Sequence, residues 1–367
     1  MLVISLLETA MPHTRINTFD QLTVPDASAA ALGYRMPGEF ERLSCVWLSP
    51  PENPETWPGC LDKAQNQFAD WVTLLKQAVT VRTTTELGIE TNDSWIRDYG
   101  PIFVVRDQPT DDGPVELPGA AKLPKAGVAC HDFHFNTWGR KYEVRDLDDV
   151  VPQQVARELG VPIWVHDFVL EGGSIDVNGR GTVMTTEQCL LNPNRNPGMT
   201  RVQIEAKLHE TLGTQHVIWL PGGIQGDDTD GHIDDVARFI SPDTVAVVSA
   251  PPDHPDHGVT RKNVKALTQA TDQTGGALNI VELPVPQTIT YDYPDGRGVV
   301  PASYANFLIA NRHVFVPTFG QPSDDAALGV LAGAMPGYAV VPVRAESLVV
   351  GLGALHCLSQ QQPAGSV

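Results

Sequence analysis

The chain has 367 residues, of which 42% are hydrophobic, so it can bury a large core. Lysine and arginine number 25 and aspartate and glutamate number 44, which gives a formal net charge of −19. Such an acidic chain repels phosphate backbones, and no nucleic-acid partner is expected. An acidic cleft would instead attract a small cation, although acidity also serves solubility alone.

The cysteines at positions 45, 60, 130, 189 and 357 are widely spread and form no C-x-x-C pair. Their odd number and spacing disfavour a disulfide framework and a structural zinc site, so a reducing, cytoplasmic location is expected. The opening run MLVISLLETAM is apolar but short and lacks a basic start. It is a poor signal peptide and too short to span a membrane, and no membrane partner is expected.

Periodicity, capping residues and terminal glycines predict five helices. They cover residues 60–79, 151–160, 199–213, 259–272 and 323–335. Short β-rich runs lie around them, at residues 44–49, 101–105, 161–170, 181–186, 216–220, 236–240, 244–250, 279–285, 306–311, 313–319 and 347–353. Two or more strands per helix favour repeated modules of a small mixed sheet plus one helix over a parallel, doubly wound sheet. Residues 107–127 are loop-like and are expected to be an insertion between strands.

Four polar clusters each follow an apolar run. They are TNDSWIRDYGP (91–101), LEGGSIDVNG (170–179), LPGGIQGDDTDGHIDD (220–235) and GLGALHC (351–357). Their glycines allow the backbone to approach a ligand closely. His232, Asp234 and Asp235 are candidate ligands of a divalent metal, but no His-rich zinc spacing accompanies them, so metal catalysis is not favoured.

Cys357 is a candidate nucleophile, against the alternative that it fills core space as a small hydrophobic residue. Its neighbour His356 would point to the opposite face of a strand, so it is expected to be a packing or hydrogen-bonding histidine. His232 is the better proton-transfer partner, because nearby carboxylates would raise its pKa. On the same reasoning Asp234 shares a strand face with His232 if that segment is extended.

Several carboxylates lie in these clusters, among them Asp93, Asp98, Glu171 and Asp234. Taken singly, each is most often a turn residue, a cap or a surface charge. Together they would form an acidic pocket with Trp95 as a flat wall. A guanidinium group fits such a pocket, because it pairs with carboxylates through two parallel hydrogen bonds and stacks on aromatic faces.

The sequence resembles the agmatine deiminases of the bacterial peptidylarginine deiminase family, which are guanidine-modifying enzymes. The matching blocks run in order from about residue 36 to residue 363: MPGEFE, NDSWIRDYGPIFVV, LEGGSIDVNGRGTVMTTEQCLLNPNRNP, GDDTDGHIDDVARF, PASYANFLIANRHVFVPTFG and GALHCLSQQQP. The resemblance implies a five-bladed α/β propeller (pentein) of ββαβ-type modules with pseudo-fivefold symmetry. It would form a single domain over residues 36–367, with residues 1–35 as an N-terminal extension and a candidate for disorder. The family needs no metal or cofactor, and a homodimer or larger homo-oligomer is expected.

The resemblance also implies roles for individual residues. Cys357 matches the nucleophile and His232 the general acid/base. Asp98 and Asp234 match the guanidinium-binding carboxylates, and Glu171 matches the acid that holds and tunes the histidine.

Trp95, Asp228 and Gly353 are the expected substrate-binding residues. Asp228 departs from the family pattern, because a glutamate is typical four residues before the histidine and contacts the distal amine. Asp230 stands where asparagine is common.

The expected reaction is the hydrolysis of agmatine to N-carbamoylputrescine and ammonia, through a covalent thiouronium on cysteine. One alternative is a deiminase that acts on peptidyl-arginine or on another small guanidine. The alternative from a different class is a non-catalytic binder of cationic amines, for which a thiol would be superfluous.

Overall fold

The computed structural model describes residues 27–106, 127–143 and 146–365. Within them, five three-stranded sheets repeat one connection pattern. The middle strand of each sheet pairs antiparallel with one neighbour and parallel with the other. Each parallel pair is joined through helical segments, as a parallel connection requires. The predicted module of a small mixed sheet plus a helix is therefore confirmed.

The sheets are, in order, β17 (Ser359–Pro363), β1 (Leu43–Leu48) and β2 (Thr80–Thr83); β3 (Ile102–Arg106), β4 (Gly127–His134) and β5 (Ile163–Val169); β6 (Asp176–Val177), β7 (Thr182–Thr186) and β8 (His216–Leu220); β9 (Ala237–Ser241), β10 (Thr244–Val248) and β11 (Asn279–Leu283); and β14 (Leu308–Ala310), β15 (His313–Thr318) and β16 (Ala339–Arg344). A separate hairpin is formed by β12 (Thr290–Tyr293) and β13 (Gly296–Val299).

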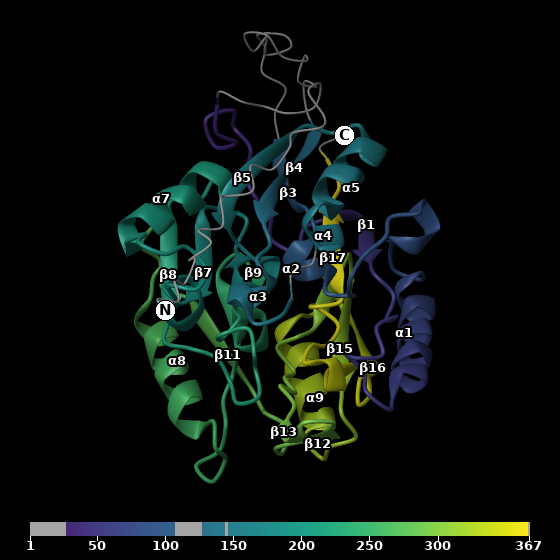
Figure 1. The fold of residues 1–367 in the computed structure, drawn as a ribbon. Coiled ribbons are helices and arrows are strands. Elements are labelled where there is room, and N and C mark those ends of the chain that lie inside the picture. Colours follow the sequence, from purple (N-terminus) through teal and green to yellow (C-terminus); the bar gives the residue numbers. More distant parts are fainter. Residues whose placement is uncertain (1–26, 107–126, 144–145, 366–367) are drawn as a thin grey trace, which may run out of the picture.

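The longer helices are α1 (Leu61–Leu75), α5 (Val151–Leu159), α7 (Arg201–Leu212), α8 (His257–Gln269) and α9 (Asp324–Ala334). Four of them lie inside a predicted helix, and α8 begins two residues before its predicted start, so all five predicted helices are confirmed with ends that differ by up to four residues. The short helices are α2 (Ile96–Tyr99), α3 (Thr137–Arg140), α4 (Asp146–Asp149) and α6 (Glu187–Leu190), with 3₁₀ turns η1 (Thr85–Leu87), η2 (Gly172–Ser174), η3 (Ile233–Asp235) and η4 (Leu348–Gly351). In Figure 1, α1 lies on one side of the molecule and α7 and α8 lie on the other, with the strands between them.

Local sequence explains these elements. Helix α1 buries Ala64, Phe68, Trp71 and Leu75, which recur every three or four residues and so share one face. Helix α7 begins with a capping box, in which the Thr200 side chain and the N3 glutamine satisfy orphan N–H groups. Apolar side chains from helices and strands merge into three buried clusters.

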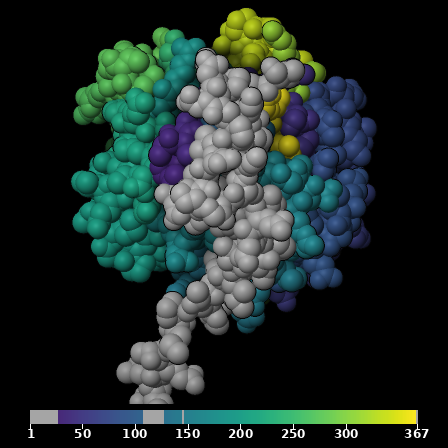
Figure 2. All heavy atoms as spheres, turned by 90° about the horizontal axis from the view of Figure 1, so that it is seen from above, coloured from purple at the N-terminus to yellow at the C-terminus, as the bar shows by residue number. Residues whose placement is uncertain are grey.

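The two ends of the described chain meet in one sheet. Strand β17 pairs antiparallel with β1, with Ser359 opposite Leu48. Yellow C-terminal atoms accordingly lie beside purple and blue N-terminal ones (Figure 2). This pairing fixes the loop that carries Cys357, a residue that lies two positions before the start of β17.

One predicted strand is wrong. The run 347–353 forms the 3₁₀ turn η4 and then a left-handed turn at Leu352, with a φ of 74°. The apolar, β-branched residues of this run are buried in the core, so the composition of the run is that of a buried strand. His356 and Cys357 therefore do not alternate along a strand. His232 likewise caps η3, so it and Asp234 do not share the face of an extended segment.

The boundary proposed at residue 36 also needs adjustment. Tyr34 is buried and packs edge-on against Trp164. Arg35 forms a β-bridge with Val105, and the Ala30 N–H donates to the carbonyl of Glu210. Residues 27–35 thus belong to the packed part of the chain, whereas residues 1–26 lie outside the described residues, as does 107–126 of the expected insertion. Along the described ranges, no helix has both the length and the apolar character needed to cross a membrane.

Candidate active site

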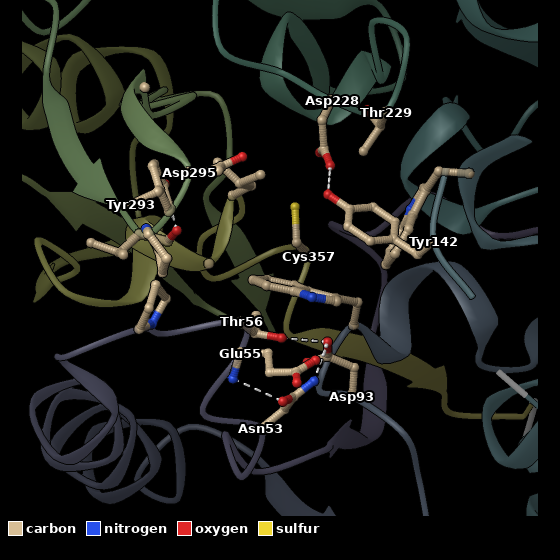
Figure 3. Close-up of a pocket in the computed structure, with 18 of the residues that line it drawn as sticks. Asn53, Glu55, Thr56, Asp93, Tyr142, Asp228, Thr229, Tyr293, Asp295 and Cys357 are labelled. Carbon is tan, nitrogen blue, oxygen red and sulfur yellow. Dashed lines mark hydrogen bonds between the residues drawn. The ribbon is translucent and has the colours of Figure 1, made fainter. Parts of the chain in front are cut away.

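A cavity of about 580 Å³ opens at the ends of several modules. Five predicted site residues line it: Trp95, Asp98, Asp228, His232 and Cys357. Figure 3 shows the Cys357 sulfur in its centre, with Asp228 and Tyr142 on one side and Tyr293 and Asp295 of the β12–β13 hairpin on the other.

Asn306 holds the loop of Cys357. Its amide Nδ2 donates to the Cys357 sulfur at 3.0 Å, and its Oδ1 accepts from the His356 backbone N–H at 2.9 Å. The thiol donates in turn to Asp234 Oδ2 at 3.5 Å. Because Asn306 hydrogen-bonds to both the backbone and the sulfur, the thiol has a fixed position in the cavity lining.

Three of the predicted groups converge above Gly173. A Cβ atom added there would lie 2.6 Å from His232 Nδ1, 2.8 Å from Asp98 Oδ1 and 3.0 Å from Asp234 Oδ2. Any side chain at this position would fill the space that the three groups share. The glycine is needed because the backbone itself approaches the polar groups, as its N–H donates to Asp98 Oδ1 at 2.9 Å.

Asp98 is held by neutral donors. Besides the Gly173 N–H, the indole Nε1 of Trp138 donates to its Oδ2 at 2.9 Å. Burial raises the pKa of Asp98 to about 6, against the opposing effect of His232. The free site therefore holds one carboxyl that titrates just below neutral pH.

His232 is buried at the start of η3, with its Nδ1 3.7 Å from Asp98 Oδ1. Burial alone would lower the pKa of His232, but Asp98 and then Cys189 and Glu171 raise it well above its ordinary value. The imidazole is therefore held in its protonated form in the free site.

Glu171 has a different main partner from the one expected. Its Oε1 pairs with Arg195 Nε at 2.6 Å, and both side chains are fully buried. A carboxylate oxygen of Glu171 still lies within 4.8 Å of a ring nitrogen of His232 and of the Cys189 sulfur. Glu171 thus acts on His232 through its charge, and Arg195 neutralises part of that charge.

Asp234 lies behind the cavity wall. Its Oδ2 faces His356 Nδ1 at 2.7 Å, and its Oδ1 is buried with no hydrogen bond to the described residues. Burial opposes ionisation, but His356 more than offsets it, and the pKa of Asp234 is lowered. An ionised carboxylate thus lies next to the thiol, and its Oδ1 has no hydrogen bond to the described residues.

The thiol of Cys357 is in an unfavourable field for ionisation. Burial raises its pKa well above the ordinary value, and the carboxyls of Asp234, Asp235 and Asp98 raise it further. The Asn306 hydrogen bond acts in the other direction but does not offset them. In the free site Cys357 is a neutral thiol.

The cavity mouth carries Asp228, which accepts a hydrogen bond from the Tyr142 hydroxyl. Lys141 donates to the backbone carbonyl of Asp228 and pairs with Asp230 at 2.7 Å. Asp230 also pairs with Arg195 and adopts a left-handed φ of 66°, a conformation that asparagine and aspartate tolerate. The extra negative charge of Asp230, which stands where asparagine is common, is therefore neutralised by Lys141 and Arg195.

Trp95 lines the cavity and packs on Trp57, with ring centroids 5.4 Å apart. Gly353, in contrast, is not among the residues that line the cavity. An added Cβ there would lie 2.5 Å from the Trp95 ring and 2.9 Å from the Cys357 Cβ. Gly353 thus allows the tryptophan and the cysteine to pack together and stands beneath the binding surface.

The site is completed by further residues that no sequence pattern predicted: Glu39, Trp138, Tyr142, Cys189, Arg195 and Asn306. Four of these stand inside the blocks quoted above, so the signal was present but carried no spacing that identified a role. Trp138 and Tyr142 follow β4 in an irregular segment with positive φ at Thr137, Trp138 and Arg140, which no periodicity reveals.

Among the described residues, two sets of three bring metal-ligating atoms within 4.8 Å of one another: Glu171, Cys189 and His232, and Asp234, Asp235 and Cys357. Protein donors already engage both. Arg195 binds Glu171, and Asn306 Nδ2 donates to Asp235 at 2.9 Å as well as to the Cys357 sulfur.

Residues 35–363 match the model of the Porphyromonas-type peptidyl-arginine deiminase family, and the chain belongs to this family. Its fold is the mixed α/β fold of the agmatine deiminase structures described next.

The agmatine deiminase of Enterococcus faecalis is 32% identical, with a TM-score of 0.83 over 93% of this chain and 99% of its own. A Cys→Ser variant of the Campylobacter jejuni agmatine deiminase, solved with substrate bound, is 29% identical, with a TM-score of 0.78 over 91% of this chain and 97% of its own. A curated relative from Lactococcus lactis is 35% identical over 90% of this chain and 96% of its own.

The state of the thiol can be tested by alkylation. Because burial and three carboxyls raise the pKa of Cys357, its reaction with iodoacetamide should accelerate about tenfold per pH unit up to at least about pH 9. Peptide mass mapping would follow Cys357 specifically. Asp234→Asn, which removes one negative charge, should move the profile to lower pH. A plateau near pH 7 in the wild-type protein would show that the thiol is ionised in the free site.

Proposed function

We propose that the protein hydrolyses the guanidinium group of agmatine to N-carbamoylputrescine and ammonia, with Cys357 as the nucleophile. The observation that carries the proposal is the convergence of Asp98, Asp234 and His232 on one point beside a fixed thiol. Two buried carboxylates beside a neutral thiol suit a planar cation with several N–H donors. The Cys→Ser variant of the C. jejuni relative, which was solved with substrate bound, supports the role of the cysteine.

Binding of the substrate would activate the thiol. The guanidinium cation cancels the field of Asp98 and Asp234, which are among the groups that raise the pKa of Cys357. Once they are paired with a cation, the thiol loses its proton to solvent more easily, and His232 keeps its own proton for the next step. The nucleophile would thus form where the substrate is present, and not in the free site.

The reaction would then proceed in two covalent steps. The thiolate attacks the guanidinium carbon, and protonated His232 gives its proton to the departing amine, which leaves as ammonia and forms an S-alkylthiouronium. Neutral His232 next takes a proton from water, and the hydroxide adds to the same carbon. As the adduct collapses, the carbon–sulfur bond breaks and the hydroxyl proton passes to the sulfur, which gives the urea product, the neutral thiol and protonated His232. Holding the carbon against the sulfur and splitting one difficult hydrolysis into two steps lower the barrier.

The mouth of the cavity supports a substrate with a second cation. Besides Asp228, Glu55 and Asp295 contribute carboxylates to the lining, and Tyr142 and Tyr293 contribute aromatic surfaces. The protonated amine of agmatine, four carbons from the guanidine, would pair with this acidic rim. Free arginine carries a carboxylate near the same place, and the rim would repel it. An arginine residue inside a peptide, one of the rival substrates, lacks a cation at this distance.

We further propose that the five repeated sheets surround the cavity as the blades of a propeller. Segments from several modules reach the cavity: α2, the loop after β4, η3, the β12–β13 hairpin and the turn after η4. A homo-oligomer, expected from the resemblance, stays a prediction.

The direct test is ammonia release from agmatine, free arginine and an arginine-terminated peptide, measured side by side. Agmatine should have the highest kcat/KM. Cys357→Ser should lose at least about a thousandfold in turnover, because serine lacks the acidity of a thiol. The variant should keep the unfolding midpoint of the wild type, which a thermal melt would check. Turnover of agmatine by Cys357→Ser would remove the mechanism, and binding of agmatine without any turnover by the wild type would favour the non-catalytic binder.

The pH profile follows from Asp98. Its pKa is raised to about 6, so the carboxylate is present above that pH and is lost as pH falls through it. kcat/KM for agmatine, which reports groups of the free enzyme, should therefore lose a further factor of about ten per pH unit below about 6, in addition to the dependence that the raised pKa of Cys357 imposes. A flat profile down to about pH 5 would show that Asp98 does not hold the cation in its ionised form.

Selectivity at the mouth can be probed at Asp228. The Tyr142 hydroxyl donates to its carboxylate and reduces its capacity to accept from an amine. Tyr142→Phe frees this carboxylate, and we expect KM for agmatine to change with kcat nearly constant, since the distal amine does not react. Asp228→Glu, which restores the family's longer side chain, should lower KM. An effect on kcat alone in both variants would contradict a role in binding the distal amine.

A further inference from the structure

His356 lies between two buried carboxylates and has no part in the mechanism above. Its Nδ1 is 2.7 Å from Asp234 Oδ2, and its Nε2 is 2.9 Å from Glu39 Oε2. All three side chains are almost completely buried. Glu39 comes from the MPGEFE segment, which leads into β1, so the ring joins the two ends of the described chain at the back of the site.

The hydrogen bonds of this ring constrain its protons. An ionised carboxylate oxygen can only accept, whereas a neutral imidazole has one donor and one acceptor nitrogen. A neutral His356 would therefore direct one ring lone pair at a carboxylate oxygen at hydrogen-bonding distance. Both contacts are satisfied only if the ring carries two protons or if one of the carboxyl groups is itself protonated.

The surroundings keep Glu39 ionised. Its Oε1 faces Arg238 Nη2 at 2.9 Å and accepts from the Ile309 N–H at 2.7 Å, and Arg97 Nη2 lies 3.5 Å from its Oε2. Burial opposes ionisation, but Arg238, His356 and Arg97 together hold the pKa of Glu39 well below its usual range. The contact with Glu39 therefore leaves the Nε2 of His356 as a donor.

The other partner, Asp234, is an acceptor at the oxygen that faces His356. The thiol of Cys357 donates to this same Oδ2, and the contact with His356 is the first of the effects that lower the pKa of Asp234. The positive charges of Arg97 and Arg238, which lie near the ring, oppose the protonation of His356. Both arginines also have other partners: Arg238 pairs with Asp176, and Arg97 donates to Gln361 and to the His356 carbonyl.

We propose that His356 stays protonated as an imidazolium and is a positioning residue. Its Nδ1 donates to Asp234 Oδ2 and so orients the carboxylate, which leaves the unbonded Oδ1 to accept from an N–H of the bound guanidinium. The charge state rests on these two contacts together with the ionised states of Glu39 and Asp234, whereas the positioning role rests on the proposed function. The two carboxylates of the site are then unequal. Asp98 is held by neutral N–H groups and titrates, whereas Asp234 is held by a cation and stays ionised.

Neutron diffraction from a deuterium-exchanged crystal of the wild-type protein at neutral pH tests the charge state without any substitution. Deuterium should appear on both Nδ1 and Nε2 of His356 and on neither oxygen of Asp234 or Glu39. Deuterium on a single ring nitrogen would overturn the proposal. This result does not depend on whether the protein deiminates agmatine.

The positioning role needs a second measurement, the binding of agmatine to Cys357→Ser by calorimetry. Adding His356→Asn, which removes the cation but keeps a donor, should weaken binding roughly 30-fold, the typical loss when a buried charge pair is broken. Glu39→Gln serves as a second variant if His356→Asn does not fold, and it should weaken binding in the same direction. His131→Asn is the matched control, since His131 is also buried and hydrogen-bonded, but to His166 and not to Asp234 or Glu39.

The outcomes separate the two ideas. If Cys357→Ser with an intact His356 binds no agmatine, the proposed function fails while the charge state can still hold. If it binds agmatine and His356→Asn binds equally well, the positioning role is wrong. Thermal unfolding of each variant shows whether a loss of binding reflects a loss of fold.

Discussion

The site depends on a thiol that is packed against carboxylates in a buried cavity. Cys357 donates to Asp234, and Asp98 lies close enough to oppose its ionisation. An arrangement that disfavours a thiolate in the free protein favours a bound cation, because the same charges act on both. In the proposed function, specificity for a positive group and control over the nucleophile would thus have one physical origin.

The surrounding protein balances this concentration of negative charge with buried cations. Arg195 pairs with Glu171, and Arg238 pairs with Asp176 and Glu39. Removing these charges from water is costly, and buried pairs seldom add to stability relative to apolar packing. Their value here is that each carboxylate has a fixed orientation and a pKa set by its own partner. Asp98 and Asp234 illustrate this, since similar side chains at one site differ in pKa because their donors differ.

The sequence predicted the five long helices and the repeated small sheets, since periodicity and caps are local signals. It failed at residues 347–353, because a buried 3₁₀ turn has the composition of a buried strand. Motifs pointed to Cys357, His232 and Asp98, which line the cavity, and their catalytic roles stay proposals. Partners such as Glu39, Arg195 and Asn306 were not found in this way, because their contacts join segments far apart in the chain and no local pattern encodes such a contact.

The central claim is that Asp98 and Asp234 grip a planar cation directly over the side chain at position 357. A crystal structure of Cys357→Ser soaked with agmatine tests it most directly. We predict guanidinium nitrogens within hydrogen-bonding distance of Asp98 and of Asp234 Oδ1. The central carbon should face the hydroxyl oxygen that the substitution introduces in place of the sulfur, and the amine should lie at the acidic mouth. Agmatine bound with its amine inward, or outside the cavity, would contradict the claim.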